Sequence, residues 1–391
     1  MYYNFNLILL YLPIKLSMAE IKLSEVKSDC RHFRGHIPCK PNKQHGVMCN
    51  DCSYYDKTDK KILIIKLGAA GDVIRTTPLL YPLKRQYPFA KIYWLTNSPE
   101  LVPTGDCEQP KADEVLKYNL QNVSYINATE FDVVINLDKD YEAISLMSTV
   151  KSKQKTGFTI KDGHCYPAGK SAEHKFLTGI FDNVSKENKQ NYISEIFDIC
   201  GYEFKGEKYI LNADKKFDKD WPINEGKMVV GLNTGCGERW TSRLWKNEYW
   251  IELIKKLIKN NFEVILLGGP GEDEKNKMLN EATDAKYFGV YDLKTFINLM
   301  DKCDAVVTQV TMSMHIAIAL EKKLILMNNI FNPNEFELYG NGEIIQPSKA
   351  CHCFFQPVCV NKVYECMEFL MPDDVFKACL RQLAIEEIKA K

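Results

Sequence analysis

The chain has 391 residues, of which 45% are hydrophobic, and its 51 basic side chains balance 51 acidic ones. This length allows two domains with full cores, and the zero net charge provides no field to attract nucleic acid, so no nucleic-acid partner is predicted. Eight of the 14 cysteines lie in two tight clusters, which indicates metal or redox chemistry in a reducing compartment rather than a disulfide scaffold.

The N-terminal residues 1–17 contain the apolar run Phe5–Ile14. This run lacks a basic flank, contains Pro13 and is too short to cross a bilayer. We therefore expect residues 1–17 to be an upstream start-site extension or a weak surface segment, with an ordinary start at Met18; a targeting signal is the alternative. No other stretch could cross a membrane, so the sequence predicts a cytoplasmic protein.

Residues 18–58 form a cysteine-rich segment with little apolar periodicity and three histidines between the cysteines. Such a segment can bury almost no core, so a Zn²⁺ held by four thiolates would supply its folding energy. One C-x2-C pair is regular and the other spacings are not, so an iron-sulfur cluster and free thiols stay open as alternatives. The predicted zinc ligands are Cys30, Cys39, Cys49 and Cys52.

Residues 59–215 alternate short β-rich apolar runs with helical periodicity, which predicts a parallel sheet covered by helices on both faces. The predicted strands are Lys61–Leu67, Lys91–Thr96, Phe131–Leu137 and Gln154–Phe158, and the predicted helices are Val73–Tyr87 and Asp140–Lys151.

A second block, residues 226–375, follows a charged linker and repeats the alternation, with a C-terminal helix at 376–391. Two such blocks predict an α/β fold of two doubly wound domains with a cleft between them. The predicted strands are Lys227–Asn233, Phe262–Leu267, Ala305–Thr308 and Leu324–Asn328, and the predicted helices are Trp245–Asn260, Asp273–Ala282, Leu293–Met300 and Thr311–Leu320.

The turn after the first strand, K-L-G-A-A-G-D-V-I-R-T-T-P at 66–78, places Gly68, Gly71 and Asp72 where a helix begins. Glycine lets the backbone approach a ligand, and the free amides of a helix start favour an anion. The motif is not the dinucleotide fingerprint G-x-G-x-x-G, so NAD binding is disfavoured. A tight turn with Asp72 as a helix cap is the structural alternative, but ligands of open α/β sheets bind at this edge.

Four motifs spaced between Lys61 and Val375 resemble glycosyltransferase family 9, the heptosyltransferases of lipopolysaccharide core assembly. Their order along the chain matches that family, which is more specific than any one motif. The motifs are GDVIRTTP at 71–78, NTGC with RLWKNEYW at 233–250, LGGPGE at 267–272 and TMSMHIAIAL at 311–320.

The resemblance implies the GT-B architecture, two facing Rossmann-like domains that bind acceptor in the first and nucleotide sugar in the second. It implies that Asp72 is the catalytic base, which deprotonates an acceptor hydroxyl for attack on the anomeric carbon with inversion. On the acceptor side it implies Gly68, Gly71 and Arg75. Donor and nucleotide contacts implied by the resemblance are Thr234, Gly235, Arg243, Gly268, Gly269, Glu272, Thr311, Met312 and His315.

Several positions depart from the family pattern. Arg243 stands where the family has lysine, and its guanidinium can still bind a phosphate through two parallel N–H donors. Val310 and Met312 replace the family's aspartate and glycine, which puts the donor in doubt and favours a catalytically inactive nucleotide-sugar-binding relative as the alternative. Replacement contacts to the donor sugar are expected from Asn329, Glu335 and Glu337.

A second cysteine set follows the last strand, and similar cysteines recur there in some members of the family. The resemblance therefore implies a loop staple, by a second metal site or by disulfides, with unlinked thiols as the alternative. The set comprises Cys351, Cys353, Cys359 and Cys366.

The expected partners are a nucleoside diphosphate sugar of the ADP-heptose kind and a glycan or glycolipid acceptor, with peripheral contact at the inner face of the membrane. No catalytic metal is expected, because an arginine and a helix terminus would neutralise the leaving diphosphate. A zinc protein of regulatory or nucleic-acid-associated type is the third function class, supported by the cysteine segment but not by the charge balance.

Overall fold

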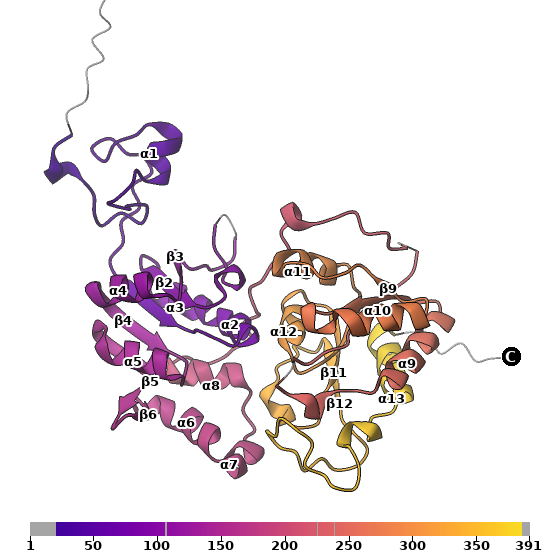
Figure 1. Ribbon diagram of the computed structural model, residues 1–391. Helices are drawn as coiled ribbons and strands as arrows, with labels where there is room; N and C mark the ends of the chain where they lie inside the picture. The colour runs from indigo at the N-terminus through magenta and orange to yellow at the C-terminus, as the bar shows by residue number, and fades with distance from the viewer. Residues whose placement is uncertain (1–20, 106–107, 225, 238, 385–391) are drawn as a thin grey trace, which may run out of the picture. The chain divides into compact units, whose positions relative to one another are not determined.

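The computed structural model describes residues 21–105, 108–224, 226–237 and 239–384 (Figure 1). The described residues divide into two compact units, a small unit at 21–59 and a large unit at 60–384. The predicted extension at residues 1–17 lies outside the described residues, as does the end of the predicted C-terminal segment, 385–391. No described helix is both long and apolar enough to cross a membrane.

The described part of the small unit contains two short helices, η1 (Leu23–Glu25) and α1 (Lys40–His45). Cys30 and Lys57 form an isolated antiparallel bridge, and Arg31 pairs with Asp56 at 2.7 Å. Among the described residues of this unit, only Pro41 is buried. The small unit therefore gains little stability from apolar burial, as its sequence predicts.

The first sheet of the large unit has the strand order β3-β2-β1-β4-β5-β6. Its strands pair in parallel except for β6, which runs antiparallel to β5. Central parallel strands are buried on both faces, and Ile62 to Ile65 of β1 are fully buried. The strands are β1 (Lys61–Ile65), β2 (Lys91–Thr96), β3 (Glu114–Lys117), β4 (Glu130–Asn136), β5 (Lys151–Lys161) and β6 (His164–Pro167).

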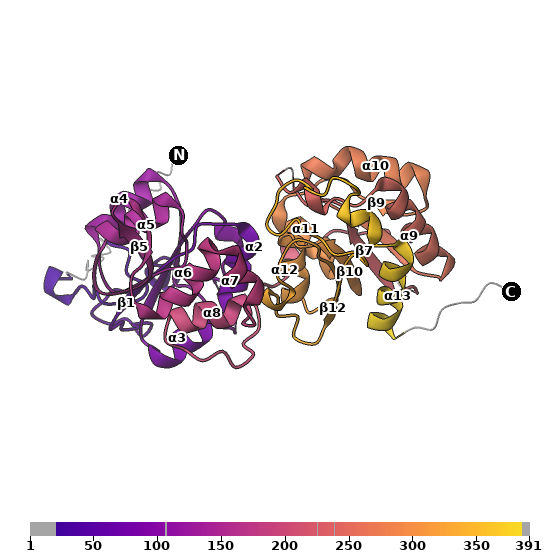
Figure 2. The same ribbon diagram turned by 90° about the horizontal axis from the view of Figure 1, so that it is seen from below.

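Helices cover both faces of this sheet (Figure 2). Ile62 and Ile64 pack with α2, α3 and α8, whereas Leu63 and Ile65 pack with α4 and α5, because successive strand residues point to opposite faces. The helices are α2 (Ala70–Thr76), η2 (Thr77–Leu79), α3 (Leu80–Gln86), η3 (Pro99–Leu101), α4 (Leu120–Ala128), α5 (Tyr141–Thr149), η4 (Lys170–Ala172), α6 (Glu173–Ile180), α7 (Asp182–Glu187) and α8 (Tyr192–Ile199).

The second sheet has the order β12-β11-β10-β7-β8-β9 and is wholly parallel. Counted from its own first strand this is 3-2-1-4-5-6 read from the other edge, the doubly wound order of Rossmann folds. The strands are β7 (Val229–Asn233), β8 (Glu263–Leu267), β9 (Lys286–Tyr287), β10 (Ala305–Gln309), β11 (Lys323–Met327) and β12 (Gly342–Ile345).

The helices of this half also form two layers, with α9, α10 and α13 on one face and α11 and α12 on the other. In α9 the buried side chains are Trp250, Leu253, Ile254 and Leu257, the spacing of one helical stripe. The helices are η5 (Lys215–Phe217), η6 (Thr241–Arg243), α9 (Asn247–Lys259), η7 (Pro270–Glu272), α10 (Asp273–Ala282), α11 (Leu293–Asp301), α12 (Met312–Ala319), η8 (Pro333–Glu335), η9 (Cys366–Phe369) and α13 (Pro372–Leu383).

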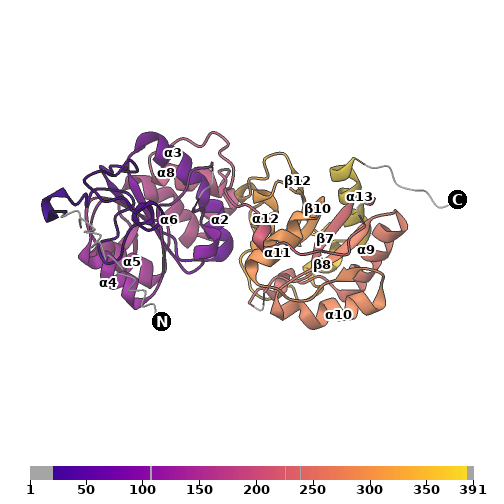
Figure 3. The same cartoon turned by 90° about the horizontal axis from the view of Figure 1, so that it is seen from above.

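The prediction of two doubly wound domains in a GT-B arrangement is confirmed, and one predicted helix is wrong. Residues 73–87 do not form one helix but α2, η2 and α3. The break at Thr77–Leu79 contains Pro78, which cannot donate a main-chain hydrogen bond and clashes with a preceding helical turn. The two halves of the large unit meet where α2 lies beside α12 (Figure 3).

Candidate active site

A cavity of about 730 Å³ lies between the two halves of the large unit, at the carboxyl ends of β1, β7 and β10. The strand order reverses between β1 and β4 in the first sheet and between β7 and β10 in the second. Open α/β sheets bind ligands at such points. The predicted site residues that line the cavity are Gly71, Asp72, Arg75, Gly235, Arg243, Gly268, Gly269, Glu272, Thr311, Met312, His315 and Glu335.

Asp72 lies in the first turn of α2 and lines the cavity, as do Glu272 and Glu335. Its Oδ1 is 2.9 Å from Nε of Arg75, an ion pair without hydrogen-bond geometry, and its Oδ2 is 3.7 Å from Nζ of Lys66. Burial alone would raise the pKa of Asp72, but the positive charges of Arg75 and then Lys66 outweigh it and lower the pKa to about 2. The carboxylate is therefore ionised at neutral pH.

Arg75 joins the two halves of the large unit across the cavity. Its Nη1 donates to Oε1 of Glu335 at 2.9 Å, and its guanidinium lies 3.4 Å from the centroid of the Tyr192 ring. The predicted acceptor-side arginine thus also contacts one of the predicted donor-sugar residues, and Glu335 competes with Asp72 for the same positive charge.

Asp138 is a positioning residue that the sequence analysis missed. Its buried carboxylate, at the end of β4, accepts hydrogen bonds from Nζ of Lys66 and from the main-chain amides of Leu67 and Gly68. These contacts hold the turn that leads into Asp72. An acid directly after the third predicted strand, Phe131–Leu137, was the available signal, because parallel strands end at the same sheet edge.

Gly71 is required by close packing between α2 and α12. A Cβ atom there would lie 2.4 Å from Cδ2 of His315, a distance that real Cβ atoms essentially never show. His315 is buried, and Oη of Tyr209 lies 3.5 Å from its Nδ1. Burial and then Arg75 lower the pKa of His315 to about 3, so the imidazole is neutral. Gly71 thus leaves room for the His315 ring, which belongs to the other half of the large unit.

Arg243 is a buried cation without an anionic partner in the part of the chain that the structure describes. Nη2 donates to the carbonyl of Cys236 at 2.9 Å and Nη1 to that of Val310, whereas the buried Nε has no acceptor. Burial lowers the pKa of the guanidinium, since no nearby carboxylate supports the charge. A buried charge of this kind is stabilised by an anion that enters the cavity.

The glycines beside β7 and β8 make room for Glu272. A Cβ at Gly235 would lie 1.9 Å from Oε1 of Glu272, and one at Gly268 would lie 2.6 Å from its Cβ. The main-chain amide of Gly269 donates to Oε2 of Glu272 at 2.9 Å. The carboxylate therefore caps its own helical turn and faces the cavity across from Gly235.

Thr311 is the N-cap of α12 and accepts from the amide of Ser313 at 3.2 Å. Asn233, at the end of β7, donates to Oγ1 of Thr308 at 3.0 Å and accepts from Oγ of Ser313 at the same distance. This buried network fixes the start of α12, whose free amides favour an anion.

Four predicted site residues lie outside the cavity lining. Thr234 donates to Oδ1 of Asn276 at 2.6 Å, and Glu337 accepts from Nδ2 of Asn191 at 3.1 Å. Asn329 donates to the carbonyl of Ser242 at 2.8 Å, and Gly68 has its amide on Asp138. The contacts of these four residues hold the loops behind the cavity wall.

Aromatic side chains that the sequence analysis did not single out line the same cavity. Trp240, Phe331 and Phe355 form a chain of edge-to-face contacts, with ring centroids 5.8 Å apart for the first pair and 5.0 Å for the second. Arg243 lies over this group, 5.4 Å from the Phe331 centroid. Flat apolar walls beside a cation suit a ligand that carries both a ring and a negative charge.

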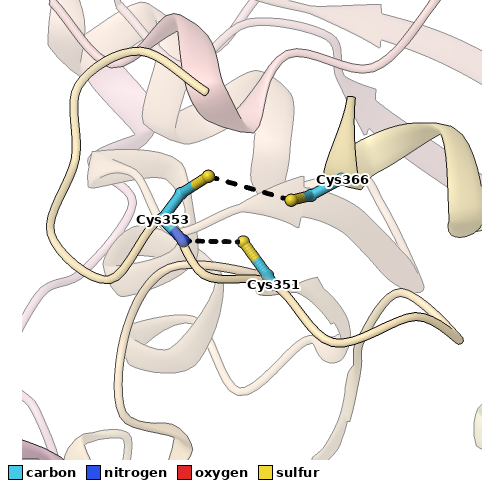
Figure 4. A group of neighbouring side chains, drawn as sticks. All are labelled: Cys351, Cys353 and Cys366. Carbon is cyan, nitrogen blue, oxygen red and sulfur yellow. Dashed lines mark hydrogen bonds between the residues drawn. The ribbon is translucent and has the colours of Figure 1, made fainter. Parts of the chain in front are cut away.

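Three cysteines of the C-terminal set, Cys351, Cys353 and Cys366, come together at one place (Figure 4). The Sγ atoms of Cys351, Cys353 and Cys366 lie within 4.8 Å of one another, and Sγ of Cys359 is 3.5 Å from that of Cys353 and 3.8 Å from that of Cys366. Two thiolates on one tetrahedral Zn²⁺ with bonds of about 2.3 Å lie about 3.8 Å apart. All four cysteines are free thiols. Cys351, Cys353 and Cys366 lie close enough together to bind one metal ion, and Cys359 lies beside two of them as a candidate fourth ligand.

The N-terminal cysteines do not converge in this way. All four, Cys30, Cys39, Cys49 and Cys52, line one cavity of about 330 Å³ in the small unit. Among the described residues, only Cys351, Cys353 and Cys366 form a group with three ligand atoms this close together. A zinc site in the small unit stays a prediction.

Two Rossmann-like domains face each other across a cavity with an ionised carboxylate on one wall and, on the other, an arginine that has no anionic partner among the described residues, which is the GT-B architecture. The family model of glycosyltransferase family 9 (heptosyltransferase) matches residues 123–362, which is more than half of the chain. The chain therefore belongs to glycosyltransferase family 9, and it is a glycosyltransferase, as its motifs predict.

Individual relatives agree with this assignment. The chain is 21% identical over 301 residues to the lipopolysaccharide core heptosyltransferase OpsX of Haemophilus influenzae, covering 73% of this chain and 84% of that protein. Its fold resembles E. coli ADP-heptose lipopolysaccharide heptosyltransferase II, with a TM-score of 0.60 at 16% identity, over 83% and 98% of the two chains. It also resembles the iron-containing dodecameric glycosyltransferase TibC of enterotoxigenic E. coli, with a TM-score of 0.52 at 12% identity, over 84% and 77%.

Proposed function

We propose that this enzyme transfers heptose or a related sugar, with inversion, from a nucleoside diphosphate sugar to a hydroxyl of a glycan or glycolipid. The product would belong to lipopolysaccharide or another cell-surface glycan, as the names of its relatives suggest. The observation that carries the proposal is Arg243, a buried cation on the cavity wall without an anion among the described residues. A diphosphate bound there would also meet the amides at the start of α12.

In the proposed reaction Asp72 accepts the proton of the acceptor hydroxyl while its oxygen attacks the anomeric carbon and the nucleoside diphosphate leaves. The pKa of about 2 makes Asp72 a weak base, so the proton moves late, when the forming bond has made the hydroxyl acidic. Arg75 and Lys66 hold the carboxylate in place. Arg243 and the start of α12 neutralise the leaving diphosphate, so we propose that transfer needs no Mg²⁺ or Mn²⁺.

The proposal is tested by a thermal-shift screen of ADP, GDP, UDP and CDP, followed by assays of nucleotide release from the matching sugars with acceptor glycolipid. ADP-heptose is the first donor to test, because a structural relative is described as an ADP-heptose lipopolysaccharide heptosyltransferase. Tight nucleotide binding without turnover of any donor would support the alternative, an inactive binding relative, for which Val310 and Met312 are the reason. No stabilisation by any nucleotide would contradict both.

The cysteine sets and the location complete the proposal. We propose structural Zn²⁺ at Cys30, Cys39, Cys49 and Cys52. We also propose a second metal ion at the C-terminal set, where iron should be tested beside zinc because the structural relative TibC is described as iron-containing. We place the enzyme in the cytoplasm with peripheral contact at the inner membrane, where a glycolipid acceptor would be reached. Cell fractionation that finds all activity away from membranes would contradict the second point.

A further inference from the structure

The C-terminal cysteines lie in and beside an unusually long irregular segment. Residues 346–365, here named the cysteine loop, run from the end of β12 to the start of η9 without a helix or strand. Irregular loops of this length in compact domains are uncommon and tend to be functional. The question is what the ordering of this loop contributes to the enzyme.

The cysteine loop carries the turn that presents Arg243. The amide of Ser242 donates to the carbonyl of Pro357 at 3.0 Å, and its Oγ donates to that of Gln356 at 2.7 Å. The hydroxyl of Thr241 also donates to the carbonyl of Pro357, at 3.3 Å. The residues just before Arg243 are thus hydrogen-bonded to the main chain of the cysteine loop.

Asn329 connects the same turn to the sulfur cluster. Its buried Nδ2 donates to the carbonyl of Ser242 at 2.8 Å and lies 3.9 Å from Sγ of Cys351. Phe355, from the middle of the cysteine loop, donates its amide to the carbonyl of Ile330 at 3.1 Å and lines the cavity. One loop therefore supports both the cation and an aromatic wall of the site.

Apolar packing alone gives this loop little stability. Among the described residues, its hydrophobic cluster has three buried members, Ile330, Cys353 and Cys366, and its other members are only partly buried. Ordering each loop residue costs about 1–2 kcal/mol in backbone entropy. The Sγ atoms of Cys351, Cys353 and Cys366 lie within 4.8 Å of one another, and that of Cys359 lies beside two of them. One metal ion bound by these thiols can offset the entropic cost of ordering the loop.

We propose that a single zinc or iron ion on Cys351, Cys353, Cys359 and Cys366 sets the position of Arg243 and thereby the affinity for the donor diphosphate. The metal is a positioning element for the donor site, since it lies behind the cavity wall and takes no part in the transfer. The effect on affinity rests on the proposed function, whereas the ordering of the 240–243 turn does not.

The test compares the full-length protein in three states: metal-loaded, stripped by a chelator, and reloaded with Zn²⁺ or Fe²⁺. Metal content is measured by elemental mass spectrometry, ADP binding by calorimetry, and backbone order by hydrogen exchange. Stripping should raise the Kd for ADP at least about tenfold, the scale of losing one charge-assisted contact, and should speed exchange in residues 240–249. Reloading should reverse both changes.

Two variants separate this site from the rest of the chain. Cys353→Ser should lose one equivalent of metal and behave as the stripped protein even when metal is supplied, whereas Cys165→Ser, a cysteine on β6, should behave as the parent. Arg243→Ala should bind ADP weakly whether or not the metal is present, because the metal acts through that residue.

Equal exchange in residues 240–249 with and without metal would overturn the proposal, as would failure of the loaded chain to hold any ion at these cysteines. The exchange measurement needs no bound nucleotide, so it tests the ordering role of the metal by itself. If instead no nucleotide binds in any state while the exchange difference persists, the ordering role stands and the proposed function fails. An exchange difference with an unchanged Kd for ADP would overturn the link to the donor site.

Discussion

Replacing Arg243 by methionine tests whether this arginine binds ligand or stabilises the fold. The side chain is buried, yet it donates only to two main-chain carbonyls and makes no ion pair with a described residue. Methionine keeps the contact with the aromatic wall and removes the charge. The free energy of unfolding should therefore stay within about 1 kcal/mol of the parent, because removing an uncompensated buried charge offsets the lost hydrogen bonds.

The effect on ligand binding should be much larger. Arginine has five N–H donors, of which two are used by carbonyls, so the remaining ones can reach phosphate oxygens. A hydrogen bond to a charged group is worth about 1.5–3 kcal/mol, so the Kd for the preferred nucleoside diphosphate should rise by about tenfold to 150-fold.

Calorimetry at fixed salt measures the affinity, and urea unfolding measures the stability. Arg239→Ala is the matched control: Arg239 is exposed beside Trp240 and does not line the cavity, so its removal should change the Kd by less than about threefold. An unchanged Kd for Arg243→Met would refute the phosphate role. A loss of several kcal/mol in stability would show instead that the arginine serves the fold.

Four further changes test the site. Asp72→Asn should keep donor affinity and lower turnover at least about a hundredfold; undiminished nucleotide release would remove this carboxylate from the mechanism. Gly71→Ala should weaken the α2–α12 contact by about 1–3 kcal/mol, since its Cβ would meet His315 at 2.4 Å; a melting temperature equal to the parent's would contradict this packing. Burial and then a nearby arginine hold the pKa of His315 at about 3, against 6.5 in the unfolded chain, so the free energy of unfolding should fall by about 1.4 kcal/mol per pH unit below pH 6.5. In the variant His315→Gln, the free energy of unfolding measured in urea between pH 7 and 5 should depend less on pH. An unchanged pH dependence would refute the role of this group. Replacing Cys49 and Cys52 by Ser should release one Zn²⁺ from the small unit and leave the main melting transition in place; equal zinc in parent and variant would exclude that site.

Much of the fold follows from local pattern, and the exceptions have local causes. The bounds predicted for β2 and α10 agree with the structure, because a buried strand and a one-sided helix each have a clear period. The strands β3, β6, β9 and β12 were not predicted, since they are short edge strands with mixed polarity. The predicted helix at 73–87 fails at Pro78, where the apolar periodicity continues but the main chain cannot remain helical.

Strand-end motifs predict where each sheet binds ligand, and the resemblance to glycosyltransferase family 9 placed Asp72 and Arg243 at one cavity, which both residues line. Three contacts could be seen only in the folded chain: Glu335 with Arg75, His315 against Gly71, and the cysteine loop with the turn before Arg243. Those contacts join residues far apart in the chain. Periodicity indicates which face of an element is buried, but the partner it meets depends on how separate layers pack, which no local pattern contains.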